Sequence, residues 1–453
     1  MRIDRARLAS LLADEQRVFA ERHPGSRALY ERARGSLLGG VPMHWMVRWA
    51  GGFPLFVTGG QGAYLIDVDG HRYLDLCLGD TGAMTGHAPE ATVAAVTAQA
   101  ARGFTFMLPT EDAVWVGEEL ARRFGLPFWQ FALTATDANR FAIRLAREIT
   151  GRRLILVFNW CYHGTVDETF ATLREGRVVA REGNVGPPVD PALTTRVVEF
   201  NNLAALEAAL APNDVACVLA EPALTNVGIV HPDPGFHQGL RELTRRTGTL
   251  LIMDETHTIC TGPGGYTRAH GLDPDLLTLG KPIAGGVPGA VYGFSESVAQ
   301  RIRAKTRVDY ADTGGIGGTL AANALATAAM RATLERVLTE ASYQRTIPLA
   351  TRFADQVDVA INDFELPWIV KRLGCRAEYW FRPVPPSNGS EAAAAVDPAL
   401  ERYMHLAALN RGILLTPFHN MALVAPAVAE ADIDRHTQVF RESVAMLLAV
   451  PVT

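Results

Sequence analysis

"LLTLGKPIAGG", residues 276–286, places a lysine directly after an apolar, strand-like run and shortly before a pair of glycines. Lysine is among the side chains least often buried. This chain has only three lysines, Lys281, Lys305 and Lys371, and arginine supplies almost all of its positive charge. A rare lysine in apolar surroundings has two explanations: it forms a buried ion pair with an acid such as Asp254, or it is kept there for its chemistry.

Four further apolar runs resemble the one that leads to Lys281. They alternate with helical stretches such as "NLAALEAALA" and lie at residues 153–159, 195–200, 216–222 and 249–255. Apolar strands that alternate with helices predict βαβ units and a mainly parallel sheet with both faces covered. The expected fold class is therefore α/β. Ligands bind beyond the carboxyl ends of the strands in such sheets.

The residues at these strand ends are chemically informative. Four of the runs end in, or lead to, a chemically active side chain: Tyr162, Glu221, Asp254 and Lys281. This places the four residues at one edge of the predicted sheet. Asp254 alone would also suit a helix cap or a surface acid. A lysine that forms a Schiff base needs a dry pocket, because desolvation lowers the pKa of the ammonium and frees the amine. Pyridoxal phosphate (PLP) is an aldehyde cofactor that uses such a lysine, and it also needs a carboxylate opposite its pyridine nitrogen.

A predicted helix start supplies a candidate phosphate site. Thr134 and Thr136 precede a helix with apolar residues at every fourth position from Phe141 to Ile149. Backbone N–H groups at a helix start bind phosphate. A simply capped helix explains the same pattern, so this stretch is informative only together with Lys281 and Asp254.

Three other segments predict local structure. The first 35 residues have the charged, amphipathic pattern of a helix. Residues 62–79 alternate around Asp69-Gly70, which is typical of a β-hairpin. Residues 382–397 are rich in proline and small residues and predict a loop.

Length and composition exclude several classes of protein. A chain of 453 residues is long enough for two or more packed subdomains. The net charge of −5 gives no indication of a nucleic-acid-binding surface. The sequence contains no run of 18 apolar residues, so we expect no membrane-spanning helix. The N-terminal stretch has no signal-peptide core. The five cysteines are scattered without CxxC spacing, so we expect a cytoplasmic protein without a metal site.

Six motifs in chain order carry a resemblance to a known family. They are "TATDAN" (134–139), "CYHG" (161–164), "AEPALTNVGIVHPDPGF" (220–236), "LLIMDETHT" (250–258), "TLGKPIAGGVPGAVYG" (278–293) and "GGTLAANALA" (317–326). From about residue 35 to about residue 440, the chain resembles class III (fold type I) PLP-dependent aminotransferases. By pattern it is most similar to glutamate-1-semialdehyde aminomutase and to β-amino-acid aminotransferases.

The resemblance implies a domain organisation. Residues 1–75 would be an N-terminal segment that belongs to a small α/β domain, residues 76–330 the large PLP-binding domain with the mainly parallel sheet, and residues 331–453 the C-terminal part of the small domain. It also implies a homodimer, because Thr319 matches a threonine that the neighbouring subunit lends to the cofactor phosphate.

The resemblance also assigns residues to the cofactor. Lys281 matches the Schiff-base lysine, and Asp254 matches the acid that pairs with the pyridine nitrogen. Thr256 takes the place of a valine that packs on one face of the ring, and Tyr162 matches the aromatic residue that stacks on the other face.

The phosphate and the phenolic oxygen of the cofactor have expected partners of their own. Ala135 and Thr136 match the Gly-Thr pair whose backbone holds the phosphate. Glu221 and Asn226 match a segment in which the acid lies near the phenolic oxygen and the lysine.

Two departures from the family pattern lie near the expected cofactor. Ala135 replaces a glycine, which makes the backbone there less free. His257 and Cys260 stand in "DETHTICTG" where the family has "DEVxTGFR". His257 then either contacts the substrate or supports other residues through a hydrogen bond.

The expected substrate pocket differs more strongly from that of the aminomutases. His44, Trp45 and Arg48 lie in "MHWMVRW", and the later segment "TPFHNMALV" carries His419 and Asn420 where the mutase has an acid and other relatives have an arginine. A carboxylate needs a charged partner to bind well. These features favour an intermolecular aminotransferase with an apolar or aromatic pocket, with Arg48 as the candidate anchor for an acid.

The expected reaction transfers an amino group from a small amine or amino acid to a keto acid or aldehyde in two half-reactions, with Lys281 shuttling the proton. The alternatives are an intramolecular aminomutase of the glutamate-1-semialdehyde type or another class III enzyme. A PLP-fold binding protein without activity is a third possibility, but a decayed pocket would normally lose its lysine or aspartate.

Overall fold

The computed structural model describes residues 3–305, 314–417 and 419–452. The chain forms two compact units. The larger unit comprises residues 90–343 and 386–394, and the smaller unit comprises residues 1–89, 344–385 and 395–453. The domain boundaries expected after residues 75 and 330 stay a prediction.

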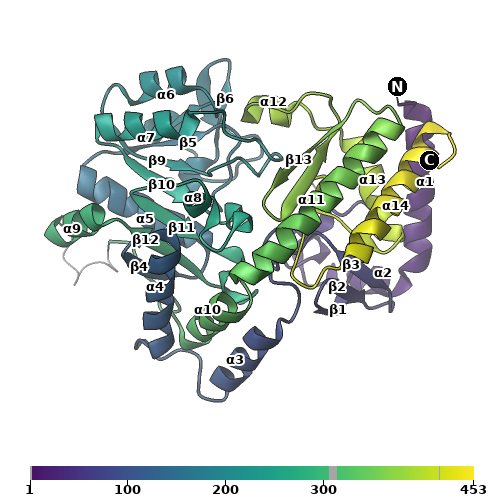
Figure 1. Cartoon of the computed structure of the whole chain (residues 1–453), viewed down its shortest axis with the longest axis horizontal. Helices are drawn as coiled ribbons and strands as arrows, with labels where there is room; N and C mark the ends of the chain where they lie inside the picture. Colours follow the sequence, from purple (N-terminus) through teal and green to yellow (C-terminus); the bar gives the residue numbers. More distant parts are fainter. Residues whose placement is uncertain (1–2, 306–313, 418, 453) are drawn as a thin grey trace. The chain divides into compact units, whose positions relative to one another are not determined.

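A seven-stranded sheet forms the centre of the larger unit (Figure 1). Its strand order is β4-β12-β11-β10-β9-β5-β8. Only β12 runs antiparallel to its neighbours, and the other pairs are parallel. In that order the strands span Phe128–Ala132, Ala290–Phe294, Leu276–Leu279, Leu250–Asp254, Val215–Ala220, Leu154–Phe158 and Thr195–Val198. The predicted α/β fold and all five predicted strands are confirmed.

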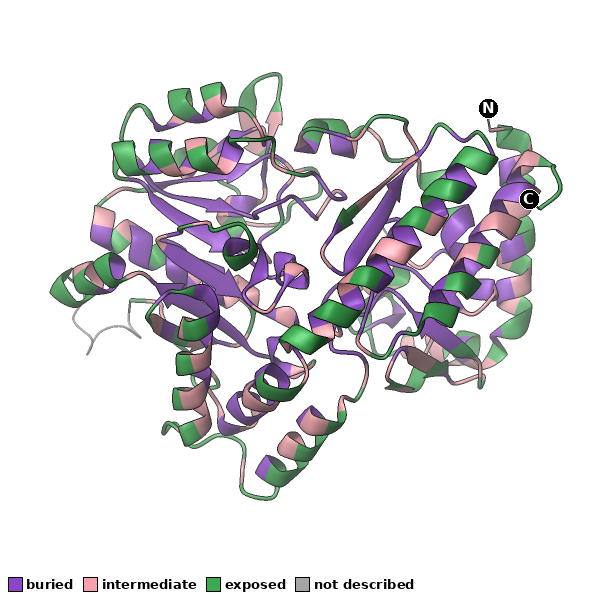
Figure 2. Cartoon of the chain, viewed as in Figure 1, coloured by how far each residue is buried: buried purple, intermediate pink, exposed green. Residues whose placement is uncertain are grey.

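Helices cover both faces of this sheet. Successive side chains in a strand point to opposite faces. Ile155 and Val157 of β5 belong to the core that helix α5 (Ala135–Thr150) completes. Phe158 points the other way and lies 5.6 Å, ring centre to ring centre, from Phe236 of α7 (Phe236–Thr247). The inner strands β5, β9, β10, β11 and β12 are accordingly buried at every residue, as Figure 2 shows for the centre of the sheet.

Helix α5 forms because its sequence is strongly amphipathic and well capped. Phe141, Leu145 and Ile149 recur every four residues and are buried against the sheet. The Thr134 hydroxyl accepts a hydrogen bond from the Asp137 N–H at 3.2 Å, which satisfies one of the free donors at the helix start. Gly151 ends the helix in the left-handed conformation, where glycine has no steric penalty.

The smaller unit contains two small sheets. One has the order β1-β2-β3-β15, with strands Val57–Gln61, Tyr64–Asp67, Arg72–Asp75 and Ile413–Leu414. Its β2–β3 pair is the hairpin predicted around Asp69-Gly70. The other sheet has the order β13-β14-β16, with strands Ile369–Leu373, Arg376–Trp380 and Met421–Leu423.

The helix predicted over the first 35 residues is two helices, α1 (Arg5–Arg22) and α2 (Pro24–Ala33). Pro24 explains the break, because proline lacks the N–H that would continue α1 but is favoured in the first turn of a new helix. The other long helices of this unit are α11 (Glu340–Asp363), which begins in the larger unit, α13 (Pro398–Asn410) and α14 (Glu430–Leu448).

The prediction of a continuous loop over residues 382–397 is wrong in part. The short helix α12 (Gly389–Ala393) interrupts it, because the Asn388 side chain caps the helix by accepting from the Glu391 N–H. The remaining elements are α3 (Glu90–Ala100), α4 (Glu111–Phe124), α6 (Leu203–Leu210), α8 (Gly265–Ala269), α9 (Glu296–Lys305), α10 (Ala324–Arg336), β6 (Ala171–Arg174) and β7 (Arg177–Ala180). Among the described residues, no helix is both long and apolar enough to cross a membrane.

Candidate functional site

Four neighbouring parallel strands, β5, β9, β10 and β11, end at one edge of the large sheet. Asp254 is the last residue of β10. Glu221 follows β9 directly, Tyr162 follows β5 after a short turn, and Lys281 lies two residues beyond β11. The structure therefore brings the strand-end residues of the larger unit to the edge where the sequence predicts a ligand.

The carboxylate of Asp254 is buried, with 4% of the residue exposed, and both of its oxygens accept hydrogen bonds. Its Oδ2 accepts hydrogen bonds from His163 Nδ1 at 2.9 Å and from Asn139 Nδ2 at 2.8 Å. Its Oδ1 accepts from the Thr256 N–H at 3.1 Å. Because a carboxylate oxygen only accepts, His163 carries its hydrogen on Nδ1.

The two buried groups hold each other in the charged state. Burial by itself raises the pKa of Asp254, but the hydrogen bond and charge of His163, together with Thr256 and Asn139, outweigh burial and lower it. Burial likewise lowers the pKa of His163, but the Cys161 sulfur and the Asp254 carboxylate outweigh it and raise it. Asp254 is thus an oriented anion inside the protein.

Lys281 starts the 3-10 helix η6 (Lys281–Ala284) and is only partly buried. Its Nζ lies 2.9 Å from His257 Nε2. An ammonium can only donate, so the His257 ring accepts through Nε2 when Lys281 is charged. The backbone of Lys281 has φ of +49°, an uncommon conformation for a residue other than glycine.

The start of α5 lies against the Lys281 segment. A Cβ on Gly280 would approach Ala135 Cβ to 3.0 Å, so this glycine allows the two backbones to meet. Gly164 (φ +77°) allows a second close approach, because a Cβ there would lie 2.1 Å from Thr136 Oγ1. Ala135 is the first residue of α5 and needs no glycine-type conformation, so its replacement of the family glycine is accommodated.

The loops after β9 and β5 are tied together. Asn226 Nδ2 donates to the Trp160 carbonyl oxygen at 3.0 Å. The Thr225 hydroxyl donates to the buried Glu221 carboxylate. These contacts fix the two loops that carry Glu221 and Tyr162.

The residues present fit PLP. Asp254 is an oriented carboxylate of the kind that a pyridine N–H requires. The Thr256 hydroxyl is buried and has no hydrogen-bond partner among the described residues. Tyr162 is 37% exposed, and its aromatic ring has the shape to cover a flat group. The backbone N–H groups at the start of α5 suit a phosphate.

The other predicted residues of the larger unit lie as follows. Thr319 is exposed, in a turn before α10. Cys260 is buried in the 3-10 helix η5 (Thr258–Thr261). The phosphate-binding role predicted for Thr319 stays a prediction.

Apart from His257, which belongs to the larger unit, the predicted substrate residues belong to the smaller unit. His44 and Trp45 form part of the 3-10 helix η2 (His44–Val47), which Arg48 follows. His44 and Arg48 are exposed, whereas Trp45 is half-buried. His419 and Asn420 are buried: His419 Nδ1 lies 3.4 Å from Glu378 Oε1, and the Asn420 side chain lies 3.2 Å from His405 Nε2.

A partly buried acid, Glu401 of α13, lies close to this group. Burial raises the pKa of Glu401 to about 7, with His419 opposing the shift and Glu378 adding to it. The unfolded carboxyl titrates near 4.5. The folded state therefore holds the extra proton between pH 4.5 and 7, and the free energy of unfolding falls as the pH rises through that window.

We therefore expect Glu401→Gln to stabilise the protein at pH 8 by about 1–3 kcal/mol, because it removes a partly buried charge. At pH 4.5 the difference should be close to zero. Urea denaturation at both pH values measures the effect. The exposed Glu118→Gln is the control, and an equal gain at both pH values would contradict the explanation.

Sequence reasoning missed two functional residues, His163 and Asn139. Both bind the Asp254 carboxylate directly. His163 stands beside Tyr162 in "CYHG", and a histidine just after a buried strand was the available signal. Asn139 gave no comparable signal, because its partner is 115 positions away in the sequence.

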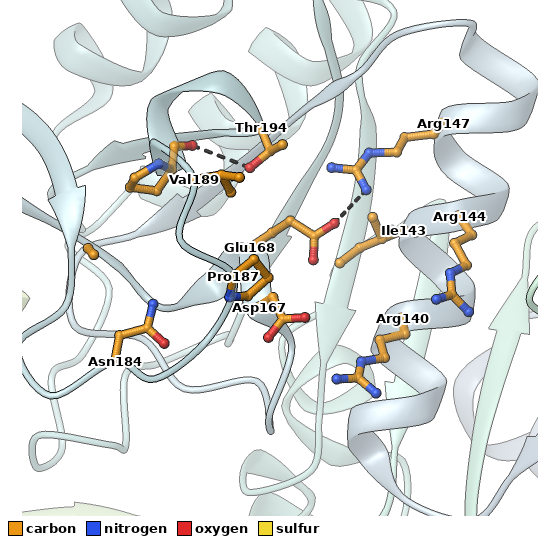
Figure 3. A pocket seen from close by; sticks show the side chains of 12 residues that line it. Arg140, Ile143, Arg144, Arg147, Asp167, Glu168, Asn184, Pro187, Val189 and Thr194 are labelled. Atoms are coloured by element: carbon orange, nitrogen blue, oxygen red, sulfur yellow. Dashed lines mark hydrogen bonds and ion pairs between the residues drawn. The ribbon is translucent and has the colours of Figure 1, made fainter.

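A separate cavity of about 420 Å³ lies in the larger unit (Figure 3). Arg140, Arg144 and Arg147 of α5 line one side of it, and Arg147 forms an ion pair with Glu168 at 2.6 Å. None of the residues predicted to hold PLP lines this cavity.

Comparisons with known proteins agree on one family. The sequence pattern of the family described as Aminotransferase class-III matches residues 46–443. Glutamate-1-semialdehyde 2,1-aminomutase from Chloroflexus aggregans is 35% identical over 449 residues, which cover 95% of this chain and 100% of that protein.

Solved structures give the same result. A glutamate-1-semialdehyde-aminomutase from Pseudomonas aeruginosa PAO1 is 51% identical, with a TM-score of 0.96 over 99% of this chain and 100% of that chain. A variant of that protein has been solved in complex with PMP. An omega-transaminase from Sphaerobacter thermophilus is 28% identical, with a TM-score of 0.85 over 95% of this chain and 99% of that chain.

Proposed function

Because this chain belongs to the class-III aminotransferase family, we propose that it is an aminomutase that moves an amino group between neighbouring carbons of glutamate-1-semialdehyde. The observation that carries the proposal is the 51% identity over 99% of the chain to a structure described as this aminomutase. Relatives at 35% and 36% identity have the same name.

This proposal replaces the intermolecular aminotransferase that the sequence favoured. That preference depended on the absence of an arginine or acid from residues 416–424. A substrate carboxylate can also be bound by residues outside this segment. The composition of the segment is therefore weaker evidence for an aminotransferase than similarity over the whole chain is for an aminomutase.

The family makes the chain a PLP-dependent enzyme of fold type I. PLP supplies an electron sink that stabilises negative charge on the carbon that loses a proton. We assign to Asp254 the role of accepting a hydrogen bond from the pyridine N–H. The contacts of Asp254 with His163, Asn139 and the Thr256 N–H support this role, because they keep the carboxylate charged and fixed.

We assign the proton transfer to Lys281. Its amine takes a proton from one carbon and returns it at another, which requires a general base within hydrogen-bonding reach. The 2.9 Å contact with His257 Nε2 supports this role, because it gives the Lys281 amine a fixed direction. We assign phosphate binding to Ala135 and Thr136, the two ring faces to Tyr162 and Thr256, and the phenolic-oxygen side to Glu221 and Asn226.

Stoichiometry tests the proposed reaction. Supplied with glutamate-1-semialdehyde alone, an aminomutase turns over many equivalents per site, because the amino group stays within the reaction. An aminotransferase stops after one equivalent unless a keto acid is added. Multiple turnovers without pyruvate or 2-oxoglutarate are therefore expected, and a stop at one equivalent would contradict the proposal.

The second candidate remains an aminotransferase for amines or amino acids. Two observations favour it: His419 and Asn420 occupy the segment where the mutase has an acid, and the S. thermophilus omega-transaminase shares the fold. The same assay with a panel of amines and keto acids would reveal it. If Arg48 anchors an acidic substrate, Arg48→Ala should weaken acids and spare simple amines.

We propose that the active unit is a homodimer, with Thr319 serving the phosphate of the partner. The exposure of Thr319 supports a role outside its own subunit. Mixing inactive Lys281→Ala chains with inactive Thr319→Ala chains should restore activity, because one site of each heterodimer regains both residues. Mixed dimers without activity above that of the parents would contradict the shared site.

We also propose that the enzyme works in the cytoplasm. All five cysteines are buried thiols, which suits a reducing compartment.

A further inference from the structure

Two histidines and an aspartate form a compact cluster in the smaller unit, and none of them is assigned to PLP or substrate. His23 joins α1 to α2, Asp67 ends β2, and His71 lies in the turn that leads to β3. One side-chain atom from each residue lies within 4.8 Å of the other two. His23 and Asp67 are buried, and the His71 side chain is 27% exposed.

The spacing of these atoms fits a metal ion. Asp67 Oδ2 lies 3.2 Å from His71 Nδ1 and 3.7 Å from His23 Nε2. A tetrahedral zinc ion with bonds of about 2.0–2.2 Å holds its ligand atoms roughly 3.3–3.6 Å apart. The two distances from Asp67 Oδ2 therefore differ from this range by only about 0.1 Å. The two histidine nitrogens lie within 4.8 Å of each other, so a bound ion would draw them together.

The surrounding contacts orient two of these three atoms, His23 Nε2 and Asp67 Oδ2. His23 Nδ1 lies 2.6 Å from the Phe19 carbonyl oxygen, so it carries the hydrogen and leaves a lone pair on Nε2. Asp67 Oδ1 accepts from the N–H groups of Asp69 at 2.9 Å and His71 at 2.8 Å, which turns Oδ2 toward the histidines. Supporting hydrogen bonds of this kind are typical of metal ligands.

While His23 is neutral, one of the two short contacts of the Tyr73 hydroxyl has no hydrogen in it. The Tyr73 hydroxyl lies 2.7 Å from both His23 Nε2 and Asp67 Oδ2. A phenol has one hydrogen to donate, so it cannot serve two acceptors. If Tyr73 donates to Asp67, the His23 Nε2 lone pair faces an oxygen lone pair. A cation at the cluster removes this conflict, because it takes the His23 lone pair and leaves the Tyr73 hydrogen to Asp67.

We propose that His23, Asp67 and His71 bind one Zn²⁺, with water as the fourth ligand on the exposed side of His71. Two imidazoles and a carboxylate are ligands that zinc accepts. The ion would fasten the α1–α2 junction to the β2–β3 hairpin. The hairpin already binds this junction, because the Asp69 carboxylate accepts hydrogen bonds from the Gly25 and Ser26 N–H groups at 2.6 and 2.9 Å. The expectation of no metal site was based on the spacing of the cysteines, and this site contains no cysteine.

Zinc binding to the full-length holoenzyme tests the proposal. We expect equilibrium dialysis against Zn²⁺, followed by elemental analysis, to give one tightly bound equivalent per chain. His71→Gln should weaken that binding by about 100-fold or more, since even loss of a supporting partner costs 10–100-fold. His71 is partly exposed, so this variant should fold. His270→Ala removes an exposed histidine elsewhere and is the matched control.

Thermal unfolding gives a second readout. Saturating Zn²⁺ should raise the Tm of the wild-type protein and of His270→Ala, because a ligand that binds only the folded state stabilises it. Neither His71→Gln nor Asp67→Asn should show this rise. The proposal is overturned if no saturable zinc binding occurs, or if both variants bind zinc as the control does. In that case the cluster is a hydrogen-bond network that holds an extra proton.

Discussion

Replacing Lys281 with alanine is expected to lower turnover by about 10²–10⁴-fold, the range associated with loss of a positioned acid or base. Lys281 lies at the carboxyl edge of the large sheet, where the parallel strands end, and its amine is directed by His257 Nε2. No other lysine follows a strand of that sheet, because Lys305 ends α9 and Lys371 lies in β13 of the smaller unit. The steady-state rate with glutamate-1-semialdehyde or with the best amine measures the loss.

Two controls separate chemistry from folding. Lys305→Ala removes an exposed lysine and should leave the rate within about twofold, since surface substitutions rarely matter. Added methylamine should restore part of the activity of Lys281→Ala, because a free amine can move the proton that the missing side chain moved. A Lys281→Ala protein that turns over at the wild-type rate would refute the assignment.

Replacing Asp254 with asparagine is expected to lower kcat by roughly 10²–10³-fold, the cost of losing one preorganised electrostatic partner. The amide keeps the shape of the side chain but not its charge, so the pyridine nitrogen loses its anionic acceptor. The same change breaks a buried ion pair with His163 at 2.9 Å. Removing one partner of such a pair costs about 3–5 kcal/mol of stability.

The stability loss should depend on pH in a defined way. The folded pKa of Asp254 is lowered, so its contribution is present above the unfolded value of 3.8 and is lost as the pH falls. The folded pKa of His163 is raised, so its contribution is complete below 6.5 and is lost as the pH rises. The difference between wild type and variant should therefore be largest between pH 4 and 6.5, measured by urea denaturation. Asp358→Asn, an exposed change, is the control, and a difference independent of pH would contradict the ion pair.

The sequence predicted the sheet and its edge because both depend on local patterns. Apolar runs marked β5, β8, β9, β10 and β11, and the residues that end them were already visible in the chain. The two-helix start was predictable in principle, because Pro24 cannot continue α1. The short helix α12 was not predictable in this way, because its capping residue Asn388 lies in a stretch of proline and small residues that is typical of a loop.

The site was predicted less completely than the fold. Asp254 and Lys281 stand out because charged residues end buried strands. The groups that bind the Asp254 carboxylate do not stand out in the sequence. Asn139, for example, lies in helix α5, which comes close to Asp254 only in the folded protein. The choice between mutase and transaminase was harder still. It depended on residues 416–424, where the absence of one side chain says little about what binds instead.

The most direct test of the central claim is to find which lysine holds PLP. The purified protein, reduced with borohydride and digested with trypsin, should yield one pyridoxyl-modified peptide, and mass spectrometry should place the modification on Lys281. A modification on Lys305 or Lys371, or a protein that takes up no pyridoxyl group, would contradict the account.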